Sequence, residues 1–581
     1  MPNTLTVSLR QLSHGAMAIS LVGVGACTDS ATGGGTPPVS AATAVTLNNF
    51  GVSTVTGSGG VRFVNPGRYA VIPQFAATQD FATGTQRATV ADFPFTIGGI
   101  ASVTARIETL PFEAPNLSAV EAFHMRMRSM ERAEEPRAIA FMQELAKRPP
   151  VNLSVQSAQA QVTRNFRVLS ALTGGTFTTV TARLAYTGDN ILLYVDNQAV
   201  VSTTFTDAEY ASFGRQFDVD LFPIDVRTFG PTSDVDGNGK TFVLFTPIVN
   251  RLTLTTGQCG SYVAGFFNSA DLSGSVNGNR AEIFYTAVPG EPAGGPTCTP
   301  LSLNVVRVSA AATFIHELQH MISYNQHVLS RSGSSEDVWL NEGLSHMAEE
   351  LGGKLYETRY PCPNLPPCPP AGRATTSQIF PDSAQGFLPP NFGNAYDFFS
   401  SRLEYSLTSP TGFGTTEERG VSWLFLRWLV DQKGEARLTQ LVQTRSTGTA
   451  NIEAVAGEAF PVLFADFLAA TLLDDFPGAT PGEIPGRYQY TSRNLRAIYA
   501  RLNTIAAAQY PTAYPLDVND LPVTAKLTPS SPVVSRLMKP GSLDLFQFMS
   551  TTGNTGLSFK PATGTFLGSL NAQVTVVRLP N

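Results

Sequence analysis

Four of the six histidines in this 581-residue chain fall within one short segment. Two of them, His316 and His320, belong to the sequence HELQH, with Glu317 directly after the first. On a helix, side chains at positions i and i+4 project from the same face, so both imidazoles can bind a single Zn²⁺. Glu317 would lie beside them without binding the metal, where it can take a proton from an attacking water and pass it to a leaving amine. The pattern predicts a hydrolytic site with one catalytic zinc ion.

A catalytic zinc site needs a third protein ligand and an open position. Glu342, in the sequence WLNEGLS, is the preferred candidate, because SRSGSSED before it can form a loop that returns a second helix beside the metal. His346 lies one turn further on the same face and is the alternative ligand, or a residue that faces substrate. His327 is excluded by the HExxHxxGxxH spacing, since serine and glutamine stand where that arrangement needs glycine and histidine. We expect His327 at the surface.

The sequences FIHELQHMISYN and WLNEGLSHMAEEL carry a family resemblance. They resemble the glutamate zincins, or thermolysin-like metallopeptidases, and are more closely similar to the hyicolysin family of bacterial neutral zinc metallopeptidases. The resemblance covers about forty residues, 313–351. It implies that His316, His320 and Glu342 bind zinc, that Glu317 is the general base, and that the substrates are proteins or peptides.

One residue departs from the thermolysin pattern. That pattern continues with an aspartate that braces the first zinc histidine, and here His346 stands in its place. The partner that would fix the tautomer of His316 is therefore unassigned. For the group that stabilises the oxyanion, the candidates are His346 and Tyr396, the latter in the sequence GNAYDFF.

The elements that position these residues are predicted from hydrophobic periodicity and turn residues. Two helices, over 305–328 and 337–351, hold the HELQH and WLNEGLS sequences. The 180–200 segment predicts a hairpin that turns at Gly188-Asp189-Asn190. Short β-type runs occupy 45–76, and the chain past Phe476 is strand-like to its end. Further helices are expected over 392–407, 417–431, 435–443 and 462–475.

The predicted fold class is α+β: a zincin-type metallopeptidase domain, with a β-rich first half and a helical second half, flanked by β-sandwich-like domains. The segment 119–150 is charged, rich in methionine and helical, and is predicted as a connector or the end of a propeptide; its His124 is expected at the surface. The predicted divisions are a signal peptide (1–26), a tether (27–44), an N-terminal β domain (45–118), the helical connector (119–150), the catalytic domain (151–476) and a C-terminal β domain (477–581).

The first residues and the cysteines indicate export. An apolar run over 15–26 has the length of a signal peptide and ends in VGAC, which resembles a lipobox, so Cys27 is predicted to carry a lipid that anchors the chain to a membrane. Four cysteines remain. Sequence neighbours favour the disulfides Cys259–Cys298 and Cys362–Cys368, worth about 4 and about 2 kcal/mol by chain entropy.

A second metal is considered for the sequence SDVDGNGK. Asp234, Asp236 and Asn238 begin like a calcium loop, but Phe245 occupies the twelfth position, where an EF-hand needs glutamate. A simple turn before a buried strand is the favoured interpretation, with a Ca²⁺ site as the alternative.

Composition limits the classes of function. The net charge is −6, and no basic block or aromatic-interleaved basic patch occurs, so nucleic-acid binding has no support. The charged fraction is 14%, against roughly 25% for an average soluble chain, a value common in secreted β-rich proteins. The function predicted from the sequence is that of a secreted or surface-anchored zinc endopeptidase. The alternatives are a zinc aminopeptidase and a binding lipoprotein with a zincin-like domain.

Overall fold

The computed structural model describes residues 42–57, 59–76, 93–100, 118–147, 161–173, 175–200, 202–254, 256–259, 261–359, 386–408, 414–561 and 571–580. The predicted signal peptide, the lipobox, most of the tether and the cysteines Cys362 and Cys368 lie outside these residues. The chain combines several sheets with many helices, which agrees with the predicted α+β class.

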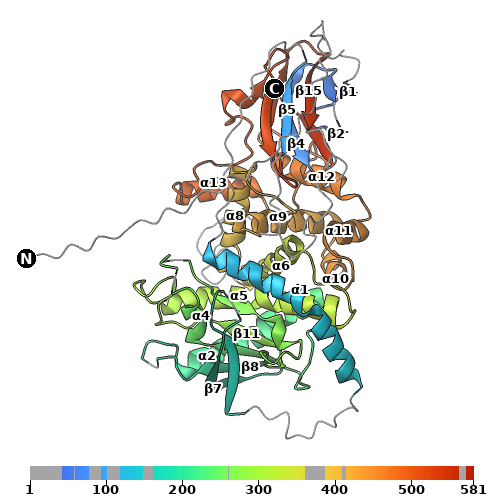
Figure 1. Cartoon of the computed structure of the whole chain (residues 1–581). Helices are drawn as coiled ribbons and strands as arrows, with labels where there is room; N and C mark the ends of the chain where they lie inside the picture. Colours follow the sequence, from blue (N-terminus) through green and yellow to red (C-terminus); the bar gives the residue numbers. More distant parts are fainter. Residues whose placement is uncertain are drawn as a thin grey trace, which may run out of the picture.

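A six-stranded sheet forms the lower part of the molecule in Figure 1, with the strand order β10-β11-β9-β8-β7-β6. Strands β8, β9 and β11 run parallel and are fully buried, as their continuous apolar sequences require. The predicted hairpin is confirmed as the antiparallel pair β7–β8. The bounds of these strands are β6 Thr163–Leu169, β7 Phe177–Thr187, β8 Ile191–Asp196, β9 Thr241–Phe245, β10 Gly265–Phe267 and β11 Ile283–Thr286.

Helices cover this sheet and extend above it (Figure 1). The two predicted site helices are confirmed as α5 (Leu303–Tyr324) and α6 (Val338–Arg359), and α5 continues as a π-helical turn, η4 (Asn325–Leu329). Four more predicted helices are also present: α8 Pro389–Ser400, α9 Thr416–Lys433, α10 Ala436–Val442 and α12 Phe460–Leu473. Helices that were not predicted include α2 Asp207–Arg215, α3 Phe222–Phe229, α11 Gly448–Ala456 and α13 Leu495–Ile505.

The two β domains predicted at the ends of the chain are one β-sandwich, and the prediction of separate domains is wrong. In each sheet, strands from the two ends of the chain alternate: β15 lies between β3 and β5, and β4 between β14 and β16. Phe63 and Phe548, from opposite sheets, stack with ring centroids 4.9 Å apart. The strands of the first sheet are β1 Thr43–Val45, β3 Gly59–Phe63, β15 Thr555–Pro561, β5 Phe93–Gly99 and β13 Val534–Met538. Those of the second are β12 Lys526–Leu527, β14 Phe546–Ser550, β4 Gly67–Phe75, β16 Ala572–Leu579 and β2 Val52–Thr56.

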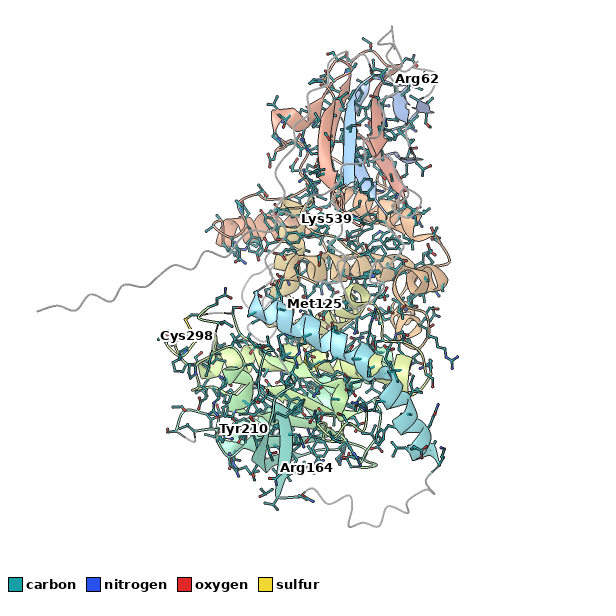
Figure 2. The ribbon with its side chains drawn as sticks, in the orientation of Figure 1. Arg62, Met125, Arg164, Tyr210, Cys298 and Lys539 are labelled. Carbon is teal, nitrogen blue, oxygen red and sulfur yellow. A yellow bond between two sulfur atoms is a disulfide. The ribbon has the colours of Figure 1, made fainter. Side chains whose placement is uncertain are left out.

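The predicted helical segment is confirmed as α1 (Ala119–Ala146), which begins with a capping box between Ser118 and Glu121. It does not stand apart as a connector. In Figure 1, α1 crosses the molecule between the lower sheet with its helices and the upper helices. Met125, labelled in Figure 2, lies on α1 at this boundary and is buried.

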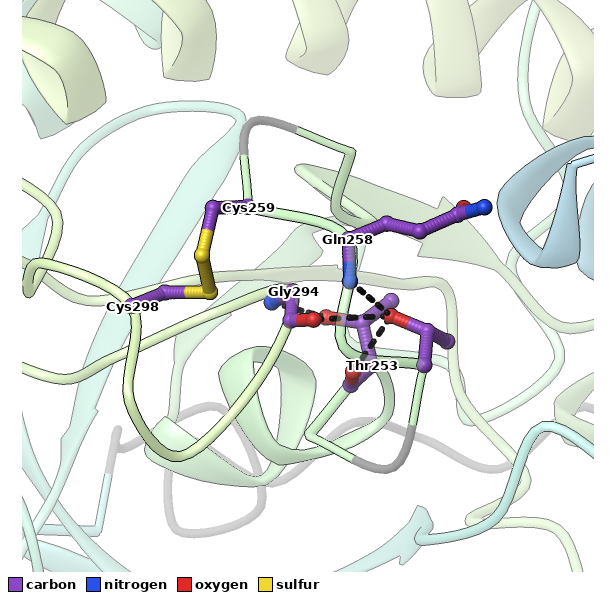
Figure 3. Close-up of a disulfide and its surroundings, with 6 residues drawn as sticks. Thr253, Gln258, Cys259, Gly294 and Cys298 are labelled. Carbon is purple, nitrogen blue, oxygen red and sulfur yellow. Dashed lines mark hydrogen bonds between the residues drawn. A yellow bond between two sulfur atoms is a disulfide. The ribbon is translucent and has the colours of Figure 1, made fainter.

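A disulfide joins Cys259 to Cys298, with an S–S length of 1.97 Å, as predicted. Figure 3 shows it beside the loop in which the amide of Gly294 donates to Thr253 Oγ1 at 2.9 Å, so the covalent link and the hydrogen bond hold the same two segments together. Among the described helices, no single one has the length and apolar composition to cross a membrane. The bent pair α11 and α12 meets that criterion by length and composition alone.

Candidate active site

Helix α5 presents the two histidines of HELQH together, and α6 returns beside it with Glu342. The Nε2 atoms of His316 and His320 are 3.2 Å apart. Glu342 Oε2 lies 3.5 Å from His316 Nε2, and its Oε1 lies 3.7 Å from His320 Nε2. All three side chains are buried. The structure thus brings together the three residues that the sequence predicted as metal ligands.

These distances fit a tetrahedral metal site. With zinc bonds of about 2.0–2.1 Å, two ligand atoms in a tetrahedron lie about 3.3 Å apart. The 3.2 Å between the two Nε2 atoms and the 3.5 Å from His316 Nε2 to Glu342 Oε2 are close to that value, and the other carboxylate oxygen, Oε1, faces His320 Nε2 at 3.7 Å. Glu342 Oε2 is buried and has no hydrogen-bond partner among the described residues. The donor set of two imidazoles and one carboxylate is one that zinc uses in catalytic sites.

The other ring nitrogen of each histidine is held by a neighbour. His316 Nδ1 lies 2.8 Å from Glu349 Oε1, so Glu349 supplies the brace that the sequence left unassigned. His320 Nδ1 lies 3.1 Å from Asn341 Oδ1 and 3.0 Å from Ser345 Oγ. These contacts favour the tautomer with the proton on Nδ1, which leaves Nε2 of both rings free for a metal.

His346 joins the site through Glu349 rather than as a direct neighbour of Glu342. Its Nδ1 lies 2.8 Å from Glu349 Oε2, and its Nε2 has no hydrogen-bond partner among the described residues. His316, His346 and Glu349 form a second set of three possible ligands. The 2.8 Å contacts on both sides of Glu349 are hydrogen-bond distances, shorter than the spacing of ligands around zinc. The structure therefore favours His346 as a hydrogen-bonded neighbour of the site.

Tyr396 is not part of this group. It is buried in α8, where its hydroxyl lies 2.8 Å from Thr512 Oγ1 and accepts from the Thr512 amide at 2.9 Å. Its ring packs against the rings of Tyr499 and Tyr510. The oxyanion role considered for Tyr396 has no support from this position.

The prediction of His327 as a surface residue is wrong. It is 0% exposed, because the helix continues past Tyr324 as η4 and is covered by the segment that contains Glu336. His327 Nε2 lies 3.8 Å from Glu336 Oε2. Burial lowers the pKa of His327 to about 4, so its ring is neutral at ordinary pH.

Glu317 is buried at the edge of the six-stranded sheet. Its Oε2 accepts a hydrogen bond of 2.9 Å from the backbone amide of Phe267, on the edge strand β10. Burial raises the pKa of Glu317 above its ordinary value. A carboxylate with a raised pKa is a better proton acceptor, which suits a general base.

Two arginines provide positive charge around the ligands. Arg419, on α9, lies 3.4 Å from Glu342 Oε2. Burial disfavours the charge of Glu342, but Arg419 and then His320 outweigh it and hold the pKa of Glu342 well below its usual range. Arg128, on α1, lies 3.8 Å from Glu317 Oε2 and 3.9 Å from Glu342 Oε1, and its side chain is only 2% exposed. Neither arginine was predicted, because both are far from HELQH along the chain.

Helix α1 packs over this site and touches the elements on both sides of it. On the sheet side, the Phe123 ring lies edge-on to Phe266 of β10, with centroids 5.4 Å apart. Arg126 donates to the carbonyl of Leu172 at 2.7 Å. The same helix places Arg128 next to the predicted general base. His124, expected at the surface, is partly buried here and interacts electrostatically with Glu342 and His316.

On the helical side, the amide of Thr416 donates to Glu121 Oε1 at 3.2 Å. The amide of Ser335 donates to Glu135 at 2.7 Å. Together with the contacts to the sheet, these bonds hold α1 in place, and Figure 1 shows it between the lower sheet with its helices and the upper helices. Its Arg128 brings α1 to 3.8 Å from Glu317 and 3.9 Å from Glu342.

The chain was compared with known proteins. No family model matches it. Over 171 residues, 29% of this chain, it is 30% identical to the neutral metalloprotease ShpI of Staphylococcus hyicus. The match spans 36% of the length of that protein. Over part of its length, this chain is distantly similar to a neutral metalloprotease.

Proposed function

We propose that this chain is a zinc-dependent endopeptidase of the glutamate zincin type, similar to the hyicolysins, that hydrolyses peptide bonds in proteins. The observation that supports this best is the buried group of His316, His320 and Glu342, whose ligand atoms lie within 4.8 Å of one another, with the buried Glu317 next to His316 on the same helix. The partial similarity to a neutral metalloprotease supports the same reaction class.

In this proposal His316, His320 and Glu342 hold one zinc ion. When bound, zinc supplies a Lewis acid that polarises the scissile carbonyl and lowers the pKa of water. Glu317 takes the proton of the attacking water and transfers it to the leaving amine. Glu349 fixes the ring of His316 during the reaction, and the amide of Phe267 fixes the carboxylate of Glu317.

The substrate would bind along β10. This strand is the edge of its sheet, pairs with β11 on one side only, and ends at the residue whose amide contacts Glu317. An extended peptide can add to such an edge through main-chain hydrogen bonds, which gives affinity without demanding one sequence. This mode fits an endopeptidase better than an aminopeptidase, which also needs acidic groups to hold a free amine.

We propose that the described conformation is latent, because Arg128 of α1 lies beside Glu317 and Glu342, and His316 and His320 are only 6% and 1% exposed with α1 in this position. The segment 28–150 does not leave as one unit in this proposal, since β1 to β5 precede α1 and are paired within the sandwich. A single cut after α1 would leave the helix attached to the sandwich. Activation therefore requires α1 itself to move away or to be cut on both sides.

We also propose that the protein is exported and anchored through a lipid on Cys27. The disulfide Cys259–Cys298 supports an oxidising compartment. The alternative of a binding lipoprotein without catalysis has less support, because such a domain gains nothing from a glutamate held beside the metal ligands. We expect no nucleic-acid partner.

Casein hydrolysis by the full chain lacking the predicted signal peptide, and by its Arg128→Met variant, tests the function. We expect 1,10-phenanthroline to abolish activity and zinc to restore it. Glu317→Gln should keep zinc but lose about 10²–10⁴ in rate, because proton transfer is what the carboxylate provides. Glu453→Gln is the matched control, since Glu453 also accepts a backbone amide, that of Phe460 at 2.8 Å, away from the site. Normal turnover by Glu317→Gln would overturn the proposal.

A further inference from the structure

A second group of oxygen ligands lies at the start of two neighbouring strands, β9 and β11. Asp234 and Asp236 belong to the loop before β9, and Glu282 directly precedes β11. One carboxylate oxygen from each residue lies within 4.8 Å of the other two. Two oxygens on opposite sides of a Ca²⁺ ion lie about 4.8 Å apart, twice its bond length, so the three carboxylates are close enough to share one ion.

Glu282 is the residue that needs a partner here. It is 1% exposed, and its Oε1 accepts from Ser233 Oγ at 2.6 Å and from the Val235 amide at 2.9 Å. Its Oε2 is buried and has no hydrogen-bond partner among the described residues. An unpaired oxygen of a buried carboxylate is costly, and a cation between Glu282 and the two aspartates would satisfy it.

The neighbouring cations do not satisfy this oxygen. Arg164, labelled in Figure 2, stands over the ring of Phe242 at 4.2 Å. It forms no ion pair with Asp234, Asp236 or Glu282 in the described part of the chain. Lys240, in the same loop, donates to the carbonyl of Asp189 at 2.8 Å instead.

The ligands are all carboxylate oxygens, without imidazole or thiolate, which favours a hard cation over zinc. We propose that Asp234, Asp236 and Glu282 bind one Ca²⁺ ion, a structural site separate from the histidine site. The sequence left such a Ca²⁺ site as the alternative to a simple turn. The loop lacks the EF-hand glutamate because Phe245 occupies its position, and Glu282 replaces that ligand from the adjacent strand.

The ion would join the loop before β9 to the residue that precedes β11. The amide of Phe242, at the start of β9, donates to the carbonyl of Glu282 at 2.7 Å. β11 then pairs with β10, whose Phe267 amide contacts Glu317. Calcium would therefore stabilise the sheet edge on which the proposed substrate site depends, without contacting the zinc ligands.

The test uses the full chain lacking the predicted signal peptide, saturated with zinc, and titrated with CaCl₂ by calorimetry and thermal unfolding. We expect one Ca²⁺ per chain with a Kd of about 10⁻⁴–10⁻³ M, the range of extracellular calcium modules. At about 10 mM CaCl₂ the midpoint temperature should rise by about 1–2 °C, because the entropy of unfolding grows with the length of the chain. MgCl₂ should give a smaller rise, because Mg²⁺ demands a more regular octahedral site.

Glu282→Gln should abolish the calcium-dependent shift while zinc content stays the same. Because a buried substitution can impair folding, Asp236→Asn is the second variant, and its exposed position makes a folded protein with weakened calcium binding the expected result. Asp271→Asn is the matched control: Asp271 is buried but already bonded to Tyr285 and Asn279. It should lower stability and keep the full calcium shift.

Absence of a calcium shift in the unmodified chain would overturn the proposal, as would a full shift in both Glu282→Gln and Asp236→Asn. Neither result would touch the proposed protease activity, since that depends on zinc and Glu317.

Discussion

Replacing Arg128 with methionine should open the candidate active site. The substitution keeps a side chain of similar length but removes the guanidinium that lies 3.8 Å from Glu317 and 3.9 Å from Glu342. Removing one partner from a buried ion pair costs about 3–5 kcal/mol. Arg128 also pairs with Glu131 of the same helix at 3.1 Å, a contact that does not hold α1 to the site. Since bound zinc also neutralises Glu342, we assign about half of that cost, ~2 kcal/mol, to the docking of α1. The equilibrium between covered and open sites should shift by about 30-fold, and casein hydrolysis should rise accordingly.

Arg132 is the matched control, one helical turn further along α1. It pairs with Asp337 at 2.8 Å, but its side chain is 39% exposed. Exposed pairs contribute about 0.2–1 kcal/mol, so Arg132→Met should raise activity by at most about fivefold. Both variants remove one positive charge from the same helix. The difference between their activities therefore measures the effect of burying the arginine at the site.

Initial rates of casein hydrolysis and hydrogen exchange of the α1 amides measure the two consequences. We expect faster exchange over residues 119–146 in Arg128→Met alone. Loss of activity in that variant would refute the reasoning and place Arg128 among the groups that act on substrate. Equal rates for Arg128→Met and Arg132→Met would show that the buried guanidinium does not hold α1 in place.

Three further predictions follow from the geometry. Glu349→Ala should weaken zinc binding about 10–100-fold, measured by competition with a chelating dye, because it removes the brace on His316. Burial raises the pKa of Glu282 to about 7. The calcium-free protein should therefore lose stability as pH rises from about 4.5 through 7, because the unfolded chain releases this proton first. Calcium binding also displaces the proton, so calorimetry should show that calcium affinity increases about five- to tenfold per pH unit between pH 5 and 7. Replacing Cys259 and Cys298 with serine should lower the free energy of unfolding in urea by about 4 kcal/mol, and an unchanged midpoint would contradict the chain-entropy account.

The three candidate metal ligands and Glu317 were predictable because they lie in two short sequence motifs, HELQH and WLNEGLS. HELQH on a helix fixes two ligand directions by periodicity, and a second helix at a suitable distance supplies Glu342. Glu349 was missed although it lies on the same face of α6, seven residues after Glu342. The thermolysin pattern places the brace one turn after Glu342, where His346 stands, whereas Glu349 supplies it from the next turn.

The residues that approach from elsewhere could not be predicted in this way. Arg128 reaches Glu317 only because α1 packs across the sheet and the helices, and no local pattern encodes that contact. Glu282, directly before β11, completes the acidic group with Asp234 and Asp236, whereas the calcium-loop pattern takes all of its ligands from one loop. Most helices were predictable by their period. The start of α11 holds Gly and Thr, which weaken that pattern, whereas α13 has a clear helical period and was missed within a stretch that was predicted as strands.

The alternation of strands in the sandwich has a consequence for the synthesis of this chain. Thr54 and Thr575, whose hydroxyl oxygens are 2.9 Å apart, are separated by 521 positions. At about 5–20 residues per second, β4 waits roughly half a minute to two minutes for its partner β16 to be made. During that time an apolar strand with unpaired edges is open to aggregation. The chain therefore needs protection at its beginning until its end has been made, and a chain that stops before Ala572 leaves β4 without the strand that covers one of its edges.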